Sequence, residues 1–162
     1  MPSQKEVGSK FRKKILPLIL APQLSSEELE ANIQFIAEDD EKTRSLIFNR
    51  NWEVRFFLFE KRYLPSIQFI REYPTIDLPI VKVDEGAVQY ILNGADIFAQ
   101  GITSIVGDFD INTIVLVSNP QDAVLALGKS LKSSSELLTF KGKAILNIHY
   151  LGDSIWQNKL AS

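Results

Sequence analysis

The apolar segments in the second half of this chain are short and lie between turn residues. Predicted strands cover 80–83, 95–99, 101–105, 113–117, 123–130 and 145–150. One helix is expected among them, because Ala87, Val88, Ile91 and Leu92 form an apolar stripe at helical spacing. Many short strands with few helices predict a small, mostly β barrel rather than a parallel sheet.

The first half of the chain combines strands with helices. Residues 44–59 contain two β-rich runs on either side of 49–51, which predicts a hairpin with a short loop. A helix is expected over 66–73, opened by Pro65 and stopped by Pro74. A further helix is expected in or after the basic N-terminal segment. The fold class is therefore predicted to be α+β.

A domain boundary is expected at 74–79, a segment with a proline at each end and no clear period. It separates an N-terminal α/β domain, residues 1–79, from a second domain, residues 80–162. The two halves differ little in charge, so charge does not distinguish their roles.

Composition excludes several classes of protein. The chain has 18 basic and 20 acidic residues, so no positive excess indicates tight, autonomous nucleic-acid binding. It has no cysteine, which excludes disulfides and thiolate metal sites. The apolar segment 15–21 is too short to span a bilayer and contains Pro17. We therefore expect a cytoplasmic protein without membrane contact.

The segment 83–105 is the best candidate for a binding surface. Asp84 is expected to cap the helix that follows, and Gly94 to end it in a left-handed conformation. Gly94 and Gly101 carry no Cβ, so a ligand can approach the main chain closely there. Asp84 and Glu85 place like charges where a phosphate would otherwise bind the helix start. Contacts are therefore expected at the other end, around 93–97.

This segment resembles the start of a PUA domain, the RNA-binding module named after pseudouridine synthases and archaeosine transglycosylases. The residues that fit the pattern are Val83, Asp84, Gly86, Ala87, Tyr90, Leu92, Gly94, Ala95, Asp96, Ile97, Gly101, Ile102, Thr103 and Ser104. The C-terminal signature of the module fits His149, Tyr150, Leu151, Gly152, Asp153 and Trp156. The resemblance implies that a PUA-type β pseudo-barrel follows an N-terminal pre-PUA domain.

The layout of the chain is similar to that of the malignant T-cell-amplified sequence family, which includes a translation-machinery-associated protein in fungi and stand-alone PUA proteins in archaea. The similarity implies binding to tRNA or rRNA on or near the small ribosomal subunit. In eukaryotic members a second protein, another translation factor, is a partner. Gln100 stands where those relatives usually have proline, and their cysteines are absent here. These differences favour an archaeal-type member.

The resemblance and the residue chemistry together give a set of candidate RNA-binding residues. They are Lys82, Tyr90, Asn93, Gly94, Ala95, Asp96, Ile97, Gly101, Lys141 and Lys143. The lysines would contact phosphates, and Asp96 can accept hydrogen bonds from ribose hydroxyls or bases, because RNA is commonly read through shape, 2′-hydroxyls and exposed ends. The alternative is that the glycines serve only the turns of the barrel and Asp84 serves only as a cap.

Other residues that could act in catalysis or metal binding are interpreted as structural. His149 is the only histidine, and no nucleophile elbow accompanies it. The acidic run 38–41 lacks the spacing and glycine of a calcium loop, and Asp108 with Asp110 lacks a third ligand. Trp52 and Trp156 are expected in the core. We therefore expect no catalytic residue, metal or cofactor.

The leading hypothesis is non-enzymatic RNA binding in translation or RNA maturation. The basic N-terminal cluster can add electrostatic contact with RNA or can be a solvated helix face. The alternative function is a protein–protein adaptor that docks on a ribosomal or RNA-modification complex with little RNA affinity of its own. The near-neutral charge of the chain favours that alternative.

Overall fold

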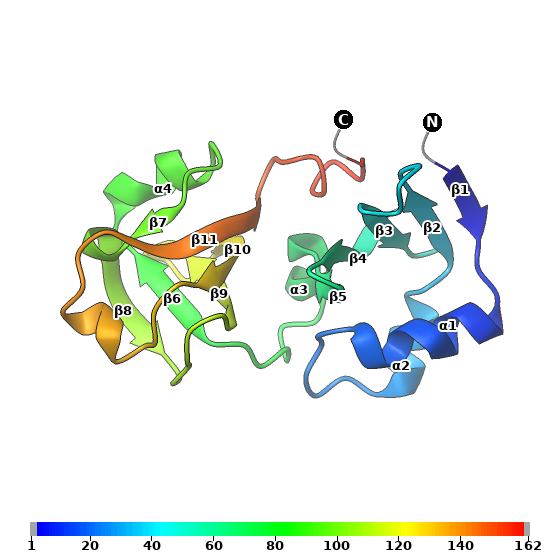
Figure 1. The fold of residues 1–162 in the computed structure, drawn as a ribbon, viewed down its shortest axis with the longest axis horizontal. Helices are drawn as coiled ribbons and strands as arrows, with labels where there is room; N and C mark the ends of the chain where they lie inside the picture. Colours follow the sequence, from blue (N-terminus) through cyan, green and yellow to red (C-terminus); the bar gives the residue numbers. More distant parts are fainter. Residues whose placement is uncertain (1–2, 161–162) are drawn as a thin grey trace. The chain divides into compact units, whose positions relative to one another are not determined.

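The computed structural model describes residues 3–160 and divides into two compact units. The first unit comprises the described residues up to Asp77 together with those from Ser154 onwards, and the second comprises Leu78–Asp153. Helices and strands occur in both (Figure 1), which confirms the α+β fold class.

The first unit is built on a five-stranded antiparallel sheet with strand order β1-β2-β3-β4-β5. The strands are β1 (Ser3–Glu6), β2 (Phe35–Glu38), β3 (Ser45–Phe48), β4 (Val54–Phe59) and β5 (Arg62–Pro65). β3 and β4 form the hairpin that the sequence predicts, with Leu46 opposite Phe57. All four residues of β3 are buried, so both faces of the sheet are covered there.

Four short helices accompany this sheet: α1 (Ser9–Ile15), η1 (Leu16–Leu18), α2 (Ser26–Ala31) and α3 (Ile67–Glu72). The Ser25 hydroxyl caps α2 by accepting from the backbone N–H of Glu28 at 3.1 Å. The prediction that Pro65 opens α3 is wrong. Pro65 is the last residue of β5, and the Ser66 hydroxyl caps the helix by accepting from the N–H of Phe69.

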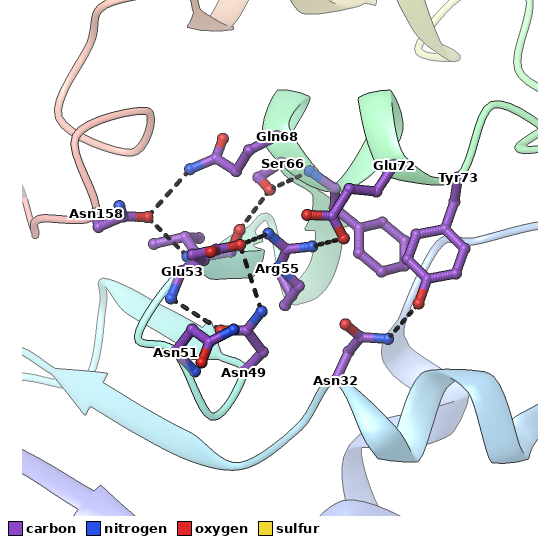
Figure 2. Close-up of polar contacts among 12 residues, drawn as sticks. Asn32, Asn49, Asn51, Glu53, Arg55, Ser66, Gln68, Glu72, Tyr73 and Asn158 are labelled. Carbon is purple, nitrogen blue, oxygen red and sulfur yellow. Dashed lines mark hydrogen bonds and ion pairs between the residues drawn. The ribbon is translucent and has the colours of Figure 1, made fainter.

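A buried arginine joins the sheet to α3 (Figure 2). The Arg55 side chain is fully buried, and its guanidinium lies 2.7 Å from the Glu72 carboxylate and 2.6 Å from that of Glu53. Phe56 packs against Phe69 with ring centroids 4.8 Å apart. These contacts fix α3 on β4, since burial of the guanidinium requires its charge partners to stay in place.

The C-terminal segment packs with the first unit (Figure 2). The Asn158 carboxamide oxygen accepts from the N–H of Val54 at 2.8 Å, and the Gln68 side chain donates to the carbonyl of Ile155 at 2.9 Å. The predicted second domain, 80–162, therefore differs from the second compact unit at its C-terminal end. The contacts that produce this difference join residues about ninety positions apart in the sequence.

The second unit contains a curled six-stranded sheet with strand order β7-β11-β10-β9-β6-β8. The strands are β6 (Ile80–Val83), β7 (Ile97–Phe98), β8 (Ile102–Val106), β9 (Ile114–Ser118), β10 (Val124–Ser130) and β11 (Lys143–Tyr150). β6 pairs with β9 in parallel, and the other pairs are antiparallel. This half-barrel agrees with the predicted pseudo-barrel.

Helical segments connect these strands: α4 (Glu85–Ile91), η2 (Ala99–Gly101) and η3 (Glu136–Leu138). β7 is shorter than the predicted strand over 95–99, because the chain turns into η2 at Ala99. Ser133 and Glu136 cap η3 reciprocally, each backbone N–H donating to the other's side chain. Hydrogen bonds from the Ser133 hydroxyl and backbone lower the pKa of Glu136 below its ordinary value.

Gly128 allows β10 and β11 to cross closely. A Cβ at this position would lie 2.3 Å from Cγ2 of Ile145 and 2.9 Å from the carbonyl oxygen of Leu146. The register between β10 and β11 shifts between Leu127 and Gly128, as expected where a glycine permits close approach. Among residues 3–160, no helix is long and apolar enough to cross a membrane.

Candidate nucleic-acid interface

An open groove of about 470 Å³ lies on the second unit, between α4 and the segment that contains β7 and η2. Its lining is mostly apolar. The residues that form it are Asp84, Gly86, Ala87, Tyr90, Ile91, Ala95, Asp96, Ile97, Phe98, Gln100 and Gly101. The groove therefore lies within the segment 83–105, the predicted binding surface.

The start of α4 is fixed against η2. The Asp84 carboxylate accepts from the N–H of Ala87 at 2.9 Å, which confirms the predicted cap. The N–H of Asp84 donates to the carbonyl of Gly101 at 2.8 Å. A Cβ at Gly101 would lie 3.4 Å from that of Ala87, so this end of the groove is closely packed. Asp84 and Glu85 place two carboxylates there, which disfavours a phosphate.

α4 ends at Ile91, and Gly94 closes the turn that follows in a left-handed conformation, as predicted. The φ of Gly94 is +93°, and its N–H donates to the carbonyl of Ile91 at 2.9 Å. A Cβ at Gly94 would lie 3.2 Å from the Tyr150 hydroxyl oxygen. The missing side chain therefore also makes room for Tyr150 of β11.

Asp96 is held by donors from β11. One carboxylate oxygen accepts from the backbone N–H of Asn147 at 2.8 Å, and the other lies 3.0 Å from the Lys143 ammonium. The Asn147 side chain donates to the carbonyls of Ile91 and Ala95. Both Asp96 oxygens thus have internal partners, which reduces the capacity of Asp96 to accept from a ribose. Asn147 was not a sequence candidate, because only the strand register brings it to Asp96.

Two aromatic side chains in the groove remain exposed to solvent. Tyr90 on α4 is 69% exposed, and Phe98 on β7 is 52% exposed. Phe98 stands opposite Lys143 in the register of β7 and β11. Exposed aromatic rings are sequence-tolerant stacking surfaces for nucleobases. Phe98 was not a sequence candidate, because Ile97, Phe98 and Ala99 are all apolar and the sequence does not show which of them faces solvent.

The structure brings only some of the sequence candidates together. Tyr90, Ala95, Asp96, Ile97 and Gly101 line the groove. Of these, Ile97 is buried in the core, so its side chain is not available to a ligand.

The remaining candidates lie outside the lining of the groove. Asn93 is exposed one residue before Gly94, and Lys141 is exposed next to Gly142, whose N–H donates to the Gln100 side chain. Lys82 forms an ion pair with Asp122 at 2.6 Å. The lysines therefore do not form one phosphate-binding cluster.

The charge of the second unit is also unfavourable for phosphate binding. It contains five lysines, no arginine and eight aspartates and glutamates. His149, which is fully buried, places its Nδ1 2.8 Å from the Asp153 carboxylate, consistent with a structural role. Within the described part of the chain, no group of three or more His, Asp or Glu could hold a metal ion. What the groove offers chemically is stacking and hydrogen bonding.

Comparisons with known proteins agree with these features. A sequence model of the PUA domain matches residues 79–151. The chain is 38% identical over 115 residues to malignant T-cell-amplified sequence 1 homolog of Dictyostelium discoideum, covering 67% of this chain and 63% of that protein. It is 32% identical over 124 residues to translation machinery-associated protein 20 of Schizosaccharomyces pombe, covering 72% of this chain and 68% of the relative. The chain belongs to this family of PUA-domain proteins.

The family assignment made from the sequence motifs is thus confirmed. This PUA-domain protein spans slightly less than two thirds of the length of several relatives, between 63% and 65%. A solved structure from the archaeon Pyrococcus horikoshii is similar at a TM-score of 0.75 and 26% identity, covering 98% of this chain and 100% of that one. Several of the relatives are named for the translation machinery. The archaeal type remains a prediction.

Proposed function

We propose that this PUA-domain protein is a non-enzymatic, cytoplasmic RNA-binding protein that acts in translation by holding an exposed segment of tRNA or rRNA. The observation that carries the proposal is the apolar groove with two solvent-exposed aromatic rings, Tyr90 and Phe98. Such a groove suits bases that are splayed out of a helix, as at loops and chain ends.

The chemistry of the groove favours base stacking over phosphate neutralisation. Tyr90 and Phe98 are the stacking surfaces, and the exposed Asn93 and Gln100 side chains can donate to base edges or 2′-hydroxyls. Lys141 is the exposed cation near Gln100, and Lys143 adds charge that Asp96 already offsets in part. Few phosphate contacts imply a shallow dependence of affinity on salt.

The role in translation rests on the relatives. Proteins named for the translation machinery share at least 31% identity with this chain over about two thirds of its length. We infer that the small ribosomal subunit, with the RNA it carries, is the place of action. RNA maturation is the other setting in which the same groove would serve.

The proposal is tested by measuring the affinity of the protein for a labelled tRNA and for a structured rRNA fragment by fluorescence anisotropy. Replacing Tyr90 and Phe98 together by alanine should weaken binding by about 30-fold or more, because each substitution removes a stacking surface that contributes about 1–3 kcal/mol. Leu138→Ala is the matched control: Leu138 is an exposed apolar side chain outside the groove. Its affinity should equal that of the unchanged protein.

Charge is tested separately with Lys141→Glu against Lys61→Glu. Both residues are exposed and both substitutions change the net charge equally, but Lys61 lies in the turn after β4 in the first unit. Lys141→Glu should weaken RNA binding several-fold and Lys61→Glu should not. Equal effects of the two substitutions would mean that only the net charge matters, which contradicts a defined groove.

The near-neutral charge of the chain favours one alternative, a protein–protein adaptor with little intrinsic RNA affinity. Sedimentation with ribosomal subunits separates the two functions. An adaptor would sediment with ribosomal subunits but would bind neither the tRNA nor the rRNA fragment detectably. In that case the Tyr90 and Phe98 substitutions would have no RNA affinity to reduce.

A further inference from the structure

Trp52 occupies a position in the β3–β4 turn where a residue with a side chain is disfavoured. Its φ is +58°, in the left-handed region that glycine and asparagine usually fill in such turns. The turn is nevertheless well defined. The N–H of Trp52 donates to the carbonyl of Asn49 at 3.1 Å, and the N–H of Asn49 donates to the carbonyl of Glu53 at 3.1 Å.

The Asn49 side chain holds this conformation (Figure 2). Its carboxamide oxygen accepts from the N–H groups of Asn51 and Glu53, each at 3.0 Å. Backbone strain that the surrounding structure maintains is concentrated at functional sites more often than elsewhere. The residue in this conformation is a tryptophan, so the turn presents a large aromatic ring.

The indole ring lies flat on Phe35. The ring centroids are 4.1 Å apart and the planes are inclined by only 5°, while Phe48 contacts the indole at 5.2 Å in a tilted orientation. Phe48 is buried, but Trp52 remains 41% exposed. One face of the indole therefore covers the two phenylalanines, and much of the ring stays open to solvent. The sequence-based expectation that Trp52 lies in the core is wrong.

The polar groups around the ring suit a nucleotide. Arg50 and Asn51 are exposed in the same turn, and Arg50 forms no ion pair with another residue in the part of the chain that the structure describes. The nearby Glu53 carboxylate is bound by Arg55 at 2.6 Å, which reduces its repulsion of a phosphate. Glu6 on β1 stands opposite Phe35 in the register of β1 and β2, so it is a further carboxylate close to the stacked rings.

We propose that Trp52, supported by Phe35, is a stacking platform for an unpaired base of single-stranded RNA, with Arg50 as the phosphate contact and Asn51 as a donor to the base edge. Aromatic rings beside cationic side chains are the usual elements of single-strand binding. This second site rests on the proposed RNA-binding function. It belongs to the first unit, whereas the groove belongs to the second.

The test uses the intrinsic fluorescence of Trp52 in the full chain. The sequence contains two tryptophans, so Trp156→Phe leaves Trp52 as the only one. Phenylalanine keeps an aromatic ring beside Arg71, whose guanidinium lies 5.4 Å from the Trp156 ring. An octamer of uridylate is titrated into this variant, and a duplex of the same length serves as the control. Stacking of a base on the indole should quench its emission with the single strand, and the duplex should quench it much less.

Affinity for the labelled octamer is then compared in Trp52→Gly and Trp52→Phe. Glycine accepts a φ of +58° without strain, so Trp52→Gly removes the ring while keeping the turn. Trp52→Gly should weaken octamer binding roughly 5- to 100-fold, and Trp52→Phe, which keeps a ring, should stay within about threefold of the unchanged protein. Circular dichroism establishes that both variants remain folded.

The outcomes separate this site from the groove. If Tyr90→Ala with Phe98→Ala reduces octamer binding while Trp52→Gly has no effect and Trp52 is not quenched, the platform is refuted and the groove stands. If neither the parent protein nor any variant binds RNA, both proposals fail. Quenching of Trp52 by a proline-rich peptide but not by RNA would identify a protein-docking site and would also refute the platform.

Discussion

The backbone N–H of Asn147 donates to the carboxylate of Asp96 at 2.8 Å, joining β11 to the residue that precedes β7. The Asn147 side chain extends this link by donating to the carbonyls of Ile91 and Ala95, at 3.1 and 2.9 Å. Ile91 is the last residue of α4, where the carbonyl groups of a helix need such partners, and Ala95 lies in the segment that follows. One asparagine on β11 thus holds the wall of the groove in place.

Asn147→Ala is expected to lower the free energy of unfolding by about 1 kcal/mol, because the Ala95 carbonyl loses its side-chain donor and the Ile91 carbonyl keeps only the N–H of Gly94. RNA affinity should fall as well, since the 93–97 segment would be held only through Asp96, by the backbone N–H of residue 147 and by Lys143. Urea denaturation measures the first effect. Asn93→Ala, which removes an exposed asparagine from the same segment, is the stability control and should change the unfolding free energy by less than about 0.5 kcal/mol.

Gly128→Ala is expected to destabilise the second unit by about 1–3 kcal/mol or more, because the new methyl would overlap Ile145 at 2.3 Å. Differential scanning calorimetry would show a lower melting temperature. Gly8→Ala is the matched control, since a Cβ there meets nothing within 4 Å. Equal melting temperatures for the two variants would contradict the close approach of β10 and β11 at Gly128.

Arg55 provides a test of how buried charge contributes to the first unit. Arg55→Ala should cost about 2–5 kcal/mol, because it leaves a cavity and removes the bridge between Glu53 and Glu72. Arg55→Met fills the space, and the two carboxylates are exposed enough to be solvated, so it should cost less than about 1.5 kcal/mol. The Arg55 Nε has no hydrogen-bond partner within residues 3–160, which also favours the apolar replacement. If methionine were as costly as alanine in urea denaturation, the ion pairs themselves would be the stabilising element.

The buried Tyr63 should make the free energy of unfolding depend on pH in the alkaline range. Burial raises the pKa of the Tyr63 phenol above its ordinary value of 10.0, and the hydrogen bond with Ser45 opposes this shift. Because the folded state favours the neutral phenol, its contribution is fully present below pH 10 and is lost as the pH rises through the raised pKa. Tyr63→Phe should therefore lose less stability between pH 9 and pH 11 than the unchanged protein does, measured by urea denaturation. An identical loss in both proteins would exclude Tyr63 as the titrating group.

Local signals in the sequence predicted local structure well. Asp84 caps α4, Gly94 closes the turn after α4 in a left-handed conformation, and 49–51 is the turn of a hairpin. Each of these features depends on hydrogen bonds within a few residues. Pro65 is instructive as an exception: it is compatible both with the first turn of a helix and with the end of a strand, and the adjacent Ser66 decides the outcome.

Features that depend on long-range pairing were not predictable in the same way. Asn147 reaches Asp96 only through the register of β11 and β7, and Asn158 reaches Val54 across most of the chain. Trp52 follows an apolar alternation that indicates burial, but the turn rotates it outward at a φ of +58°. The resemblance to a family pointed to the segment 83–105, whereas the groove and the residues that shape its wall came from the structure.

The central claim is that the groove between α4 and β7 receives RNA. Backbone amide chemical shifts, followed in a titration of the full chain with single-stranded RNA, test it most directly. The expected result is that shifts concentrate on the groove from Tyr90 to Gly101 and on the facing residues of β11, and that they disappear in Tyr90→Ala with Phe98→Ala. Shifts confined to other surfaces of the second unit, such as Asp108–Asp110 and Ser133–Ser135, or none at all, would contradict it.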